Sequence, residues 1–211
     1  MPDTPQNAPL TFPSILARQP VFDQDGAVWG HELLFRHSAE DKTAVFADAD
    51  QATLVVAAGT FSTPGNFFHN SQKILLNCSH KSILEKVPYA FPRAQTVIQV
   101  EEDMATNVNL LTTLIDLKKD GYTLAIDNFS GRADPNVLLD LIDVLIIDVL
   151  NKDPNEIQGK VSKANKFSKA RLLAKKVENQ SMRQTAVNLG FHLFQGFFFQ
   201  KPEIVAGHTL T

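Results

Sequence analysis

Apolar residues along the chain gather in short runs of strand length, separated by segments whose apolar residues recur at helical spacing. The strand-like runs lie at residues 73–79, 96–102, 122–129, 143–149, 170–178 and 191–199. Upstream, two extended runs, 15–22 and 27–36, flank Asp-Gln-Asp-Gly, and Asp-Gly between such runs is typical of a hairpin turn. The pattern therefore predicts an opening two-stranded hairpin and six further strands that alternate with helices.

The alternation of strands and helices predicts an α/β fold. Continuously apolar strands indicate burial on both faces, and helical crossovers between neighbouring strands indicate parallel pairing. A closed barrel of eight strands is the natural architecture for this order of elements. An open doubly wound sheet remains as the alternative, although the glycine fingerprint that such a sheet carries after its first strand is missing.

The length and charge of the chain indicate a folded globular protein and argue against several kinds of binding partner. The 211 residues, 44% of them hydrophobic, suffice for one substantial core. With 20 Lys and Arg against 23 Asp and Glu, the net charge of −3 gives no basic surface for a nucleic acid polymer or an anionic membrane. The single cysteine, Cys78, and the lack of a secretory or membrane-spanning apolar stretch lead us to expect a cytoplasmic protein.

Polar side chains recur at the ends of the predicted strands. In an α/β barrel the carboxyl ends of the strands carry the catalytic and binding residues. Each polar residue has a structural explanation when taken alone: Glu32 could lie on a solvated face, Asn77 could cap a helix and Asp127 could begin a turn. Recurrence at seven strand ends favours a common site instead, and the residues concerned are Glu32, Asn77, Gln99, Glu102, Asp127, Asn128, Asp148, Lys175, Glu178 and Gln195.

The segments around these residues follow the motifs of one family in order. Glu32-Leu33-Leu34-Phe35-Arg36 resembles the Glu-Ala-Leu-x-Arg signature of the EAL domains, which bind and often hydrolyse cyclic di-GMP. Six further segments resemble that family's Asn-x-Ser, Glu-x-x-Glu, Asp-Asp-Phe-Gly, Lys-x-Asp, Glu-Gly-Val-Glu and Gln-Gly-Tyr motifs, namely LLNCSHKSIL, VIQVEE, AIDNFSG, LIID, KKVEN and FQGFFFQKP. The match runs from about residue 12 to residue 202. Its sequence is most similar to the branch of the family in which the EAL domain is followed by an HDOD domain.

The resemblance implies a TIM-like (β/α)8 barrel of EAL type whose first strand is antiparallel to the others, which agrees with the opening hairpin. Residues 1–12, with three prolines among small polar residues, are expected to form a loose tail. The EAL-like domain then spans residues 13–205. Residues 206–211 are a C-terminal end that would lead to a further domain if the HDOD resemblance holds.

The resemblance also implies two Mg²⁺ or Mn²⁺ ions that activate water for attack on a phosphodiester. The metal-ligand positions that it implies and that this chain keeps are Glu32, Asn77, Asp127 and Asp148, and Glu178 and Gln195 are retained beside them. At four positions that the resemblance assigns to metal binding or catalysis this chain differs from the family. Gln99 and Asn128 replace carboxylates, Ile146 replaces a lysine, and Lys175 replaces a glutamate. We therefore expect no resident cofactor, with Mg²⁺ or Mn²⁺ bound only if the chain is an enzyme.

A second set of residues concerns the nucleotide. The resemblance implies contacts to cyclic di-GMP from Gln19, Glu32, Leu34 and Arg36, all of which are present. Arg36 would face a phosphate, for which a planar forked donor is well suited. Lys175 could take the place of a metal as a phosphate partner. By contrast, the segment SGRADPN departs from the small, Gly- and Ser-rich loop that the family has there.

The leading interpretation is a catalytically degenerate EAL signalling domain that acts as a protein-interaction module. Binding of cyclic di-GMP by such a domain, as a receptor, stays an open question. The alternative is an active cyclic di-GMP phosphodiesterase that produces pGpG, with Glu32, Asn77, Asp127 and Glu178 around one ion. A third reading is a scaffold without any nucleotide. The resemblance implies a homodimer through the face around residues 130–142. The sequence of this loop differs from the family's, so a homodimer is neither predicted nor excluded.

Overall fold

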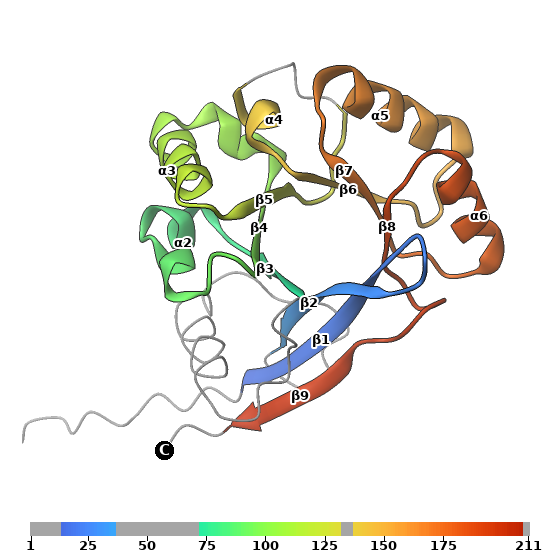
Figure 1. The fold of residues 1–211 in the computed structure, drawn as a ribbon, viewed down its shortest axis with the longest axis horizontal. Helices are drawn as coiled ribbons and strands as arrows, with labels where there is room; N and C mark the ends of the chain where they lie inside the picture. The colour runs from blue at the N-terminus through green and yellow to red at the C-terminus, as the bar shows by residue number, and fades with distance from the viewer. Residues whose placement is uncertain (1–13, 37–71, 132–136, 209–211) are drawn as a thin grey trace, which may run out of the picture.

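The computed structural model describes residues 14–36, 72–131 and 137–208. Within these ranges eight strands close into a barrel (Figure 1) in the order β2-β3-β4-β5-β6-β7-β8-β1, with β1 also paired to β2. Neighbouring strands from β2 to β8 are parallel, whereas β1 is antiparallel to both β2 and β8. The predicted closed barrel with an antiparallel first strand is confirmed, and the open sheet is wrong. The strands are β1 (Ser14–Asp23), β2 (Val28–Arg36), β3 (Lys73–Asn77), β4 (Thr96–Val100), β5 (Thr123–Ile126), β6 (Val144–Asp148), β7 (Arg171–Lys175) and β8 (Leu193–Phe194).

Helices surround the barrel on the side of β3 to β8 (Figure 1). Side-chain caps fix where the longer ones begin: the Asn107 carboxamide oxygen accepts from the backbone N–H groups of Asn109 and Leu110, and Asp153 precedes a proline at the first helical position. None of the helices in the described ranges has the length and apolar character that crossing a lipid bilayer requires. The helices are α2 (His80–Leu84), α3 (Val108–Lys119), α4 (Val137–Leu141), α5 (Pro154–Phe167) and α6 (Gln180–Asn188), with short 3-10 helices η1 (Val87–Ala90) and η2 (Glu102–Thr106).

The opening hairpin turns where Asp-Gly predicted it. The Asp23 carboxylate accepts hydrogen bonds from the backbone N–H groups of Asp25 and Ala27, at 3.0 and 2.9 Å. Gly26 has a φ of +82°, a left-handed conformation that glycine adopts without a steric penalty. The turn therefore follows from local chemistry, and it sets β1 antiparallel to β2 with Gln19 directly opposite Glu32.

Two hydrophobic clusters explain how the barrel positions polar residues. The larger cluster lies between strands and helices, and a smaller one fills the barrel interior. Side chains alternate along a strand, so a residue two positions after an interior residue also faces inward. In five strands the interior apolar residue is followed two positions later by a polar one at the carboxyl end: Leu75 by Asn77, Val97 by Gln99, Ala125 by Asp127, Leu173 by Lys175 and Leu193 by Gln195.

Some strand boundaries differ from the prediction. Strand β7 ends at Lys175 rather than at residue 178, because Lys176 has a φ of +64° and turns the chain away. Strand β8 covers only two residues of the predicted run 191–199, and the chain turns at Gly196, where a Cβ atom would lie 2.0 Å from the Val177 carbonyl oxygen. This close approach seats Gln195 against the neighbouring strand end.

One strand was not predicted. Strand β9 (Glu203–His208) pairs antiparallel with the first half of β1, outside the barrel (Figure 1). An ion pair between the Arg18 guanidinium and the Glu203 carboxylate ties the two strands together. The run after Pro202 is short and lacks clear alternation, so only its long-range pairing defines it as a strand.

Candidate functional site

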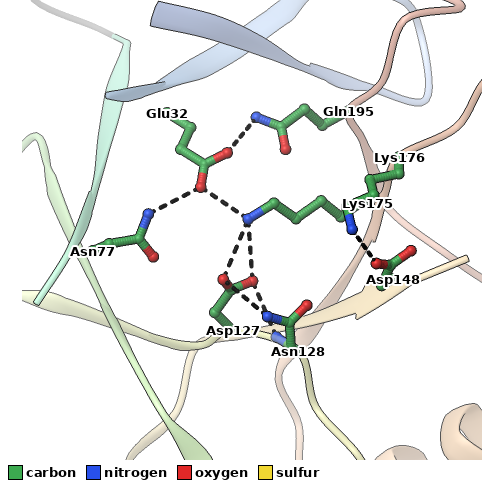
Figure 2. A network of polar contacts seen from close by, with 8 residues as sticks. All are labelled: Glu32, Asn77, Asp127, Asn128, Asp148, Lys175, Lys176 and Gln195. Carbon is green, nitrogen blue, oxygen red and sulfur yellow. Dashed lines mark hydrogen bonds and ion pairs between the residues drawn. The ribbon is translucent and has the colours of Figure 1, made fainter. Parts of the chain in front are cut away.

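The site is centred on Glu32, whose carboxylate lies inside the carboxyl end of the barrel. Its side chain is 2% exposed, so the solvated-face explanation is wrong. Three side chains donate to it (Figure 2): Asn77 at 3.1 Å and Lys175 at 2.9 Å to Oε1, and Gln195 at 2.9 Å to Oε2. Burial alone would raise the pKa of the Glu32 carboxyl, but the nearby Lys175 charge and the three donors hold that pKa below its usual value.

Lys175 joins Glu32 to a second carboxylate. From the end of β7 its side chain extends across the mouth of the barrel, and its Nζ lies 3.3 Å from both oxygens of Asp127 (Figure 2). Burial disfavours a charged amine, yet the two carboxylates raise the pKa of Lys175 above its usual value. One ammonium therefore stands between the two carboxylates, bound more closely to Glu32 than to Asp127.

Asp127 is the less compensated of the two acids. Burial and the nearby Glu32 charge raise the pKa of the Asp127 carboxyl, even though Lys175 and the Asn128 N–H act against this. Asn128 adopts a left-handed φ of +51°, and its backbone N–H donates to Asp127 Oδ1 at 3.0 Å. Its exposed carboxamide lies 3.4 Å from Asp127 Oδ2. Asn128 thus serves Asp127 as a hydrogen-bond donor.

Gln99 is buried without a partner. Its side chain at the end of β4 is only 1% exposed, and neither its amide nitrogen nor its carbonyl oxygen has a hydrogen-bond partner among the described residues. It lines a cleft of about 680 Å³ together with Asn77, Asp127, Asn128 and the acidic residues 101–103. Buried polar groups of this kind are normally paired, so Gln99 has unused capacity for a ligand or water in this cleft.

The loop after β5 is held by a residue whose role the sequence did not reveal. The Glu102 carboxylate accepts from the backbone N–H of Ser130 at 2.9 Å and from its hydroxyl at 2.6 Å. The sequence placed Glu102 among the polar residues of a common site but gave it no separate role. The two consecutive glutamates in VIQVEE were the only sequence signal for this role. The contact itself depends on the fold, which brings Glu102 to Ser130, 28 positions away.

The remaining predicted site residues lie around this network. Asp148 pairs with Lys176, at 2.6 Å, and accepts from the Leu150 N–H, so in the described contacts it stands apart from Glu32 and Asp127 (Figure 2). Ile146 packs in the barrel interior beneath the polar residues. Glu178 is exposed just beyond the end of β7.

The predicted nucleotide contacts lie on the opening hairpin. Gln19 is buried opposite Glu32 and donates to the Gln200 carbonyl at 3.0 Å, while Leu34 is half-buried. Arg36 ends β2, and its side chain lies outside the described part of the structure. Their contact with a nucleotide stays a prediction.

Comparisons with known proteins agree with this geometry. Over 92% of its length the chain is 30% identical to the cyclic di-GMP phosphodiesterase CdgJ of Vibrio cholerae, of which it covers 45%. The fold superposes on the EAL domain of Mycobacterium smegmatis DcpA with a TM-score of 0.72 at 23% identity, covering 90% of this chain and 93% of that one. The chain thus shares the fold of solved EAL domains and is similar in sequence to a cyclic di-GMP phosphodiesterase. No family model matches it.

The chain is also similar to a second curated protein and to a further solved structure. It is 33% identical to the uncharacterized protein YuxH of Bacillus subtilis over 93% of its length, and it covers 49% of that protein. The chain thus spans about half the length of the curated relatives it matches. Klebsiella pneumoniae BlrP1, solved as a manganese and cyclic di-GMP complex, has a TM-score of 0.71 at 21% identity over 94% of this chain and 58% of that one.

Proposed function

We propose that this EAL domain serves cyclic di-GMP signalling without hydrolysing the dinucleotide, as a module that transmits a signal through a protein partner. The observation that carries the proposal is the Lys175 ammonium, 2.9 Å from Glu32 and 3.3 Å from Asp127. Glu32 and Asp127 are two of the residues that the family resemblance assigns to metal ions. A site in which they neutralise an ammonium is poorly suited to concentrate two divalent cations.

The other departures act in the same direction. Gln99 and Asn128 are neutral where the resemblance expects carboxylates, and Ile146 is apolar where it expects a lysine. The resemblance implies carboxylates at seven positions, of which Gln99, Asn128 and Lys175 no longer carry one. The four that keep a negative charge are Glu32, Asp127, Asp148 and Glu178, and Asp148 is paired with Lys176. Two divalent ions carry four positive charges, whereas these four carboxylates together with the ammonium groups of Lys175 and Lys176 leave a net charge of only −2 to compensate them.

A hydrolysis assay tests the proposal. The purified chain is incubated with cyclic di-GMP and saturating Mg²⁺ or Mn²⁺, products are separated by chromatography, and CdgJ is assayed in parallel as the positive control. The expected result is intact cyclic di-GMP after prolonged incubation. Accumulation of pGpG that is abolished in a Glu32→Ala variant would establish the alternative, an active phosphodiesterase.

A receptor function for the same rim is supported by the presence of Gln19 and Leu34 on the hairpin that carries Glu32. Cyclic di-GMP is bound in the BlrP1 structure. Calorimetric titration of the chain with cyclic di-GMP, with Arg36→Ala as the comparison, decides this point. Saturable binding that is weakened in Arg36→Ala supports a receptor, and a flat titration at high concentration identifies a scaffold that acts without nucleotide.

A further inference from the structure

The polar network at the barrel mouth is arranged like a cation-binding site in which a lysine side chain of the same chain takes the place of the cation. Carboxylate oxygens from β2 and from the residue after β5 converge on one point, and that point is taken by Lys175 Nζ (Figure 2). Asn77 and Gln195 hold the Glu32 carboxylate in place from two other strands. The Glu32 carboxylate is thus positioned independently of the lysine, and the Asn128 N–H donates to Asp127 on the other side.

We propose that Lys175 is a tethered replacement for a bound metal ion, and that removing its ammonium alone opens a site for one divalent cation. The proposal rests on the proposed function, because it gives the reason why this EAL domain would not hold metal. The residues present do not fit the two ions that the family implies. A divalent ion between Glu32 and Asp127 would stand within a few ångströms of the ammonium and be repelled by it.

Charge balance favours one ion over two. Glu32 and Asp127 carry two negative charges, of which Lys175 compensates one. Without the ammonium, the two carboxylates match the charge of a single divalent cation. Two ions would need further carboxylates, and at Gln99 and Asn128 the chain offers amides instead.

Gln99 supplies an independent observation that points to a ligand in this cleft. Its amide is 1% exposed, lines the same cleft as Asn77 and Asp127, and has both polar atoms unpaired among the described residues. A carboxamide oxygen is a neutral ligand that hard cations such as Mn²⁺ and Ca²⁺ accept. In the opened site Gln99 would complete the oxygen set that Glu32 and Asp127 begin.

The test measures Mn²⁺ binding to the folded chain by electron paramagnetic resonance and calorimetry, not by turnover. Wild type should bind Mn²⁺ at least about tenfold more weakly than Lys175→Met, which should bind one ion per chain. Lys176→Met, which removes the neighbouring ammonium from Asp148, is the matched control and should behave as wild type. The ion gained in Lys175→Met should be lost again in Lys175→Met combined with Asp127→Asn.

Each other outcome overturns the proposal. Tight Mn²⁺ binding by wild type that Asp127→Asn abolishes would show that the ammonium does not exclude the ion. If Lys175→Met folds but binds no Mn²⁺, the oxygens of Glu32 and Asp127 do not form a metal site. If Lys175→Met is unfolded in buffer, Mn²⁺ should fold it, and failure to do so at saturating Mn²⁺ contradicts the proposal. Failure of the proposed function is distinguishable, because it appears as hydrolysis by wild type.

Discussion

Replacing Lys175 with methionine in metal-free buffer should destabilise the fold far more than replacing its neighbour Lys176. Lys175 lies 2.9 Å from Glu32, whose side chain is 2% exposed, whereas Lys176 and its partner Asp148 have side chains 52% and 23% exposed. At an effective dielectric of about 20, opposite charges at this separation attract by roughly 6 kcal/mol, much of which offsets the cost of burying them.

The net effect follows from what each variant leaves behind. Lys175→Met leaves the buried Glu32 charge without a counterion, and breaking a buried pair in this way costs about 3 kcal/mol or more. Lys176→Met breaks an exposed pair, for which the expected loss is below about 1 kcal/mol. Urea unfolding at pH 7, followed by circular dichroism, gives both values in EDTA-treated buffer.

The pH dependence gives a second check on the same variant. In wild type the lowered pKa of Glu32 contributes stability above its ordinary value of 4.5, and this contribution is lost as the pH falls through the lowered pKa. In Lys175→Met burial should raise the pKa of Glu32, so the folded state takes up a proton more readily than the unfolded chain. The difference between the two proteins should therefore shrink toward acid pH. Equal losses for Lys175→Met and Lys176→Met at pH 7 would mean that the Lys175 ammonium does not compensate a buried Glu32 charge.

Three further predictions concern single buried residues. Gln195→Leu removes a buried donor from the Glu32 carboxylate and should cost about 2 kcal/mol in urea unfolding; no loss would mean that the bond does not form. Gln99→Met replaces an unpaired buried amide and should raise the free energy of unfolding by about 1 kcal/mol, whereas a marked loss would show that the amide is paired. Burial, with the Arg18 charge adding to it, lowers the pKa of His31 to about 4, so its imidazole NMR signals should not titrate near pH 6.5. Because the unfolded chain binds that proton more readily, the contribution of His31 should reduce stability as the pH falls from about 6.5 toward 4, and His31→Gln should flatten this slope.

The alternation of side chains along strands made much of the site predictable. Asn77, Gln99, Asp127, Lys175 and Gln195 each follow an interior apolar residue by two positions, so the period of two brings them to one end of the barrel. The closed barrel followed from the order of strands and helices, and the turn at Gly26 from local chemistry.

Contacts between residues far apart in the sequence could not be predicted from local sequence patterns. The Lys175–Glu32 pair joins positions 143 residues apart, and whether a lysine in place of an acid points toward Glu32 or out to solvent depends on side-chain packing. Strand β9 is defined by its pairing with β1 rather than by its own sequence. The left-handed φ of Lys176 ended β7 three residues earlier than the apolar pattern indicated.

Anomalous diffraction from crystals of the wild-type chain soaked in Mn²⁺ would show directly whether Lys175 or a metal ion lies between the two carboxylates. We expect electron density for the Lys175 side chain between Glu32 and Asp127, with no anomalous peak at that position. Two manganese peaks bridged between Glu32, Asp127 and Asn128, with the lysine turned away, would contradict the account and establish the metal-dependent enzyme in its place.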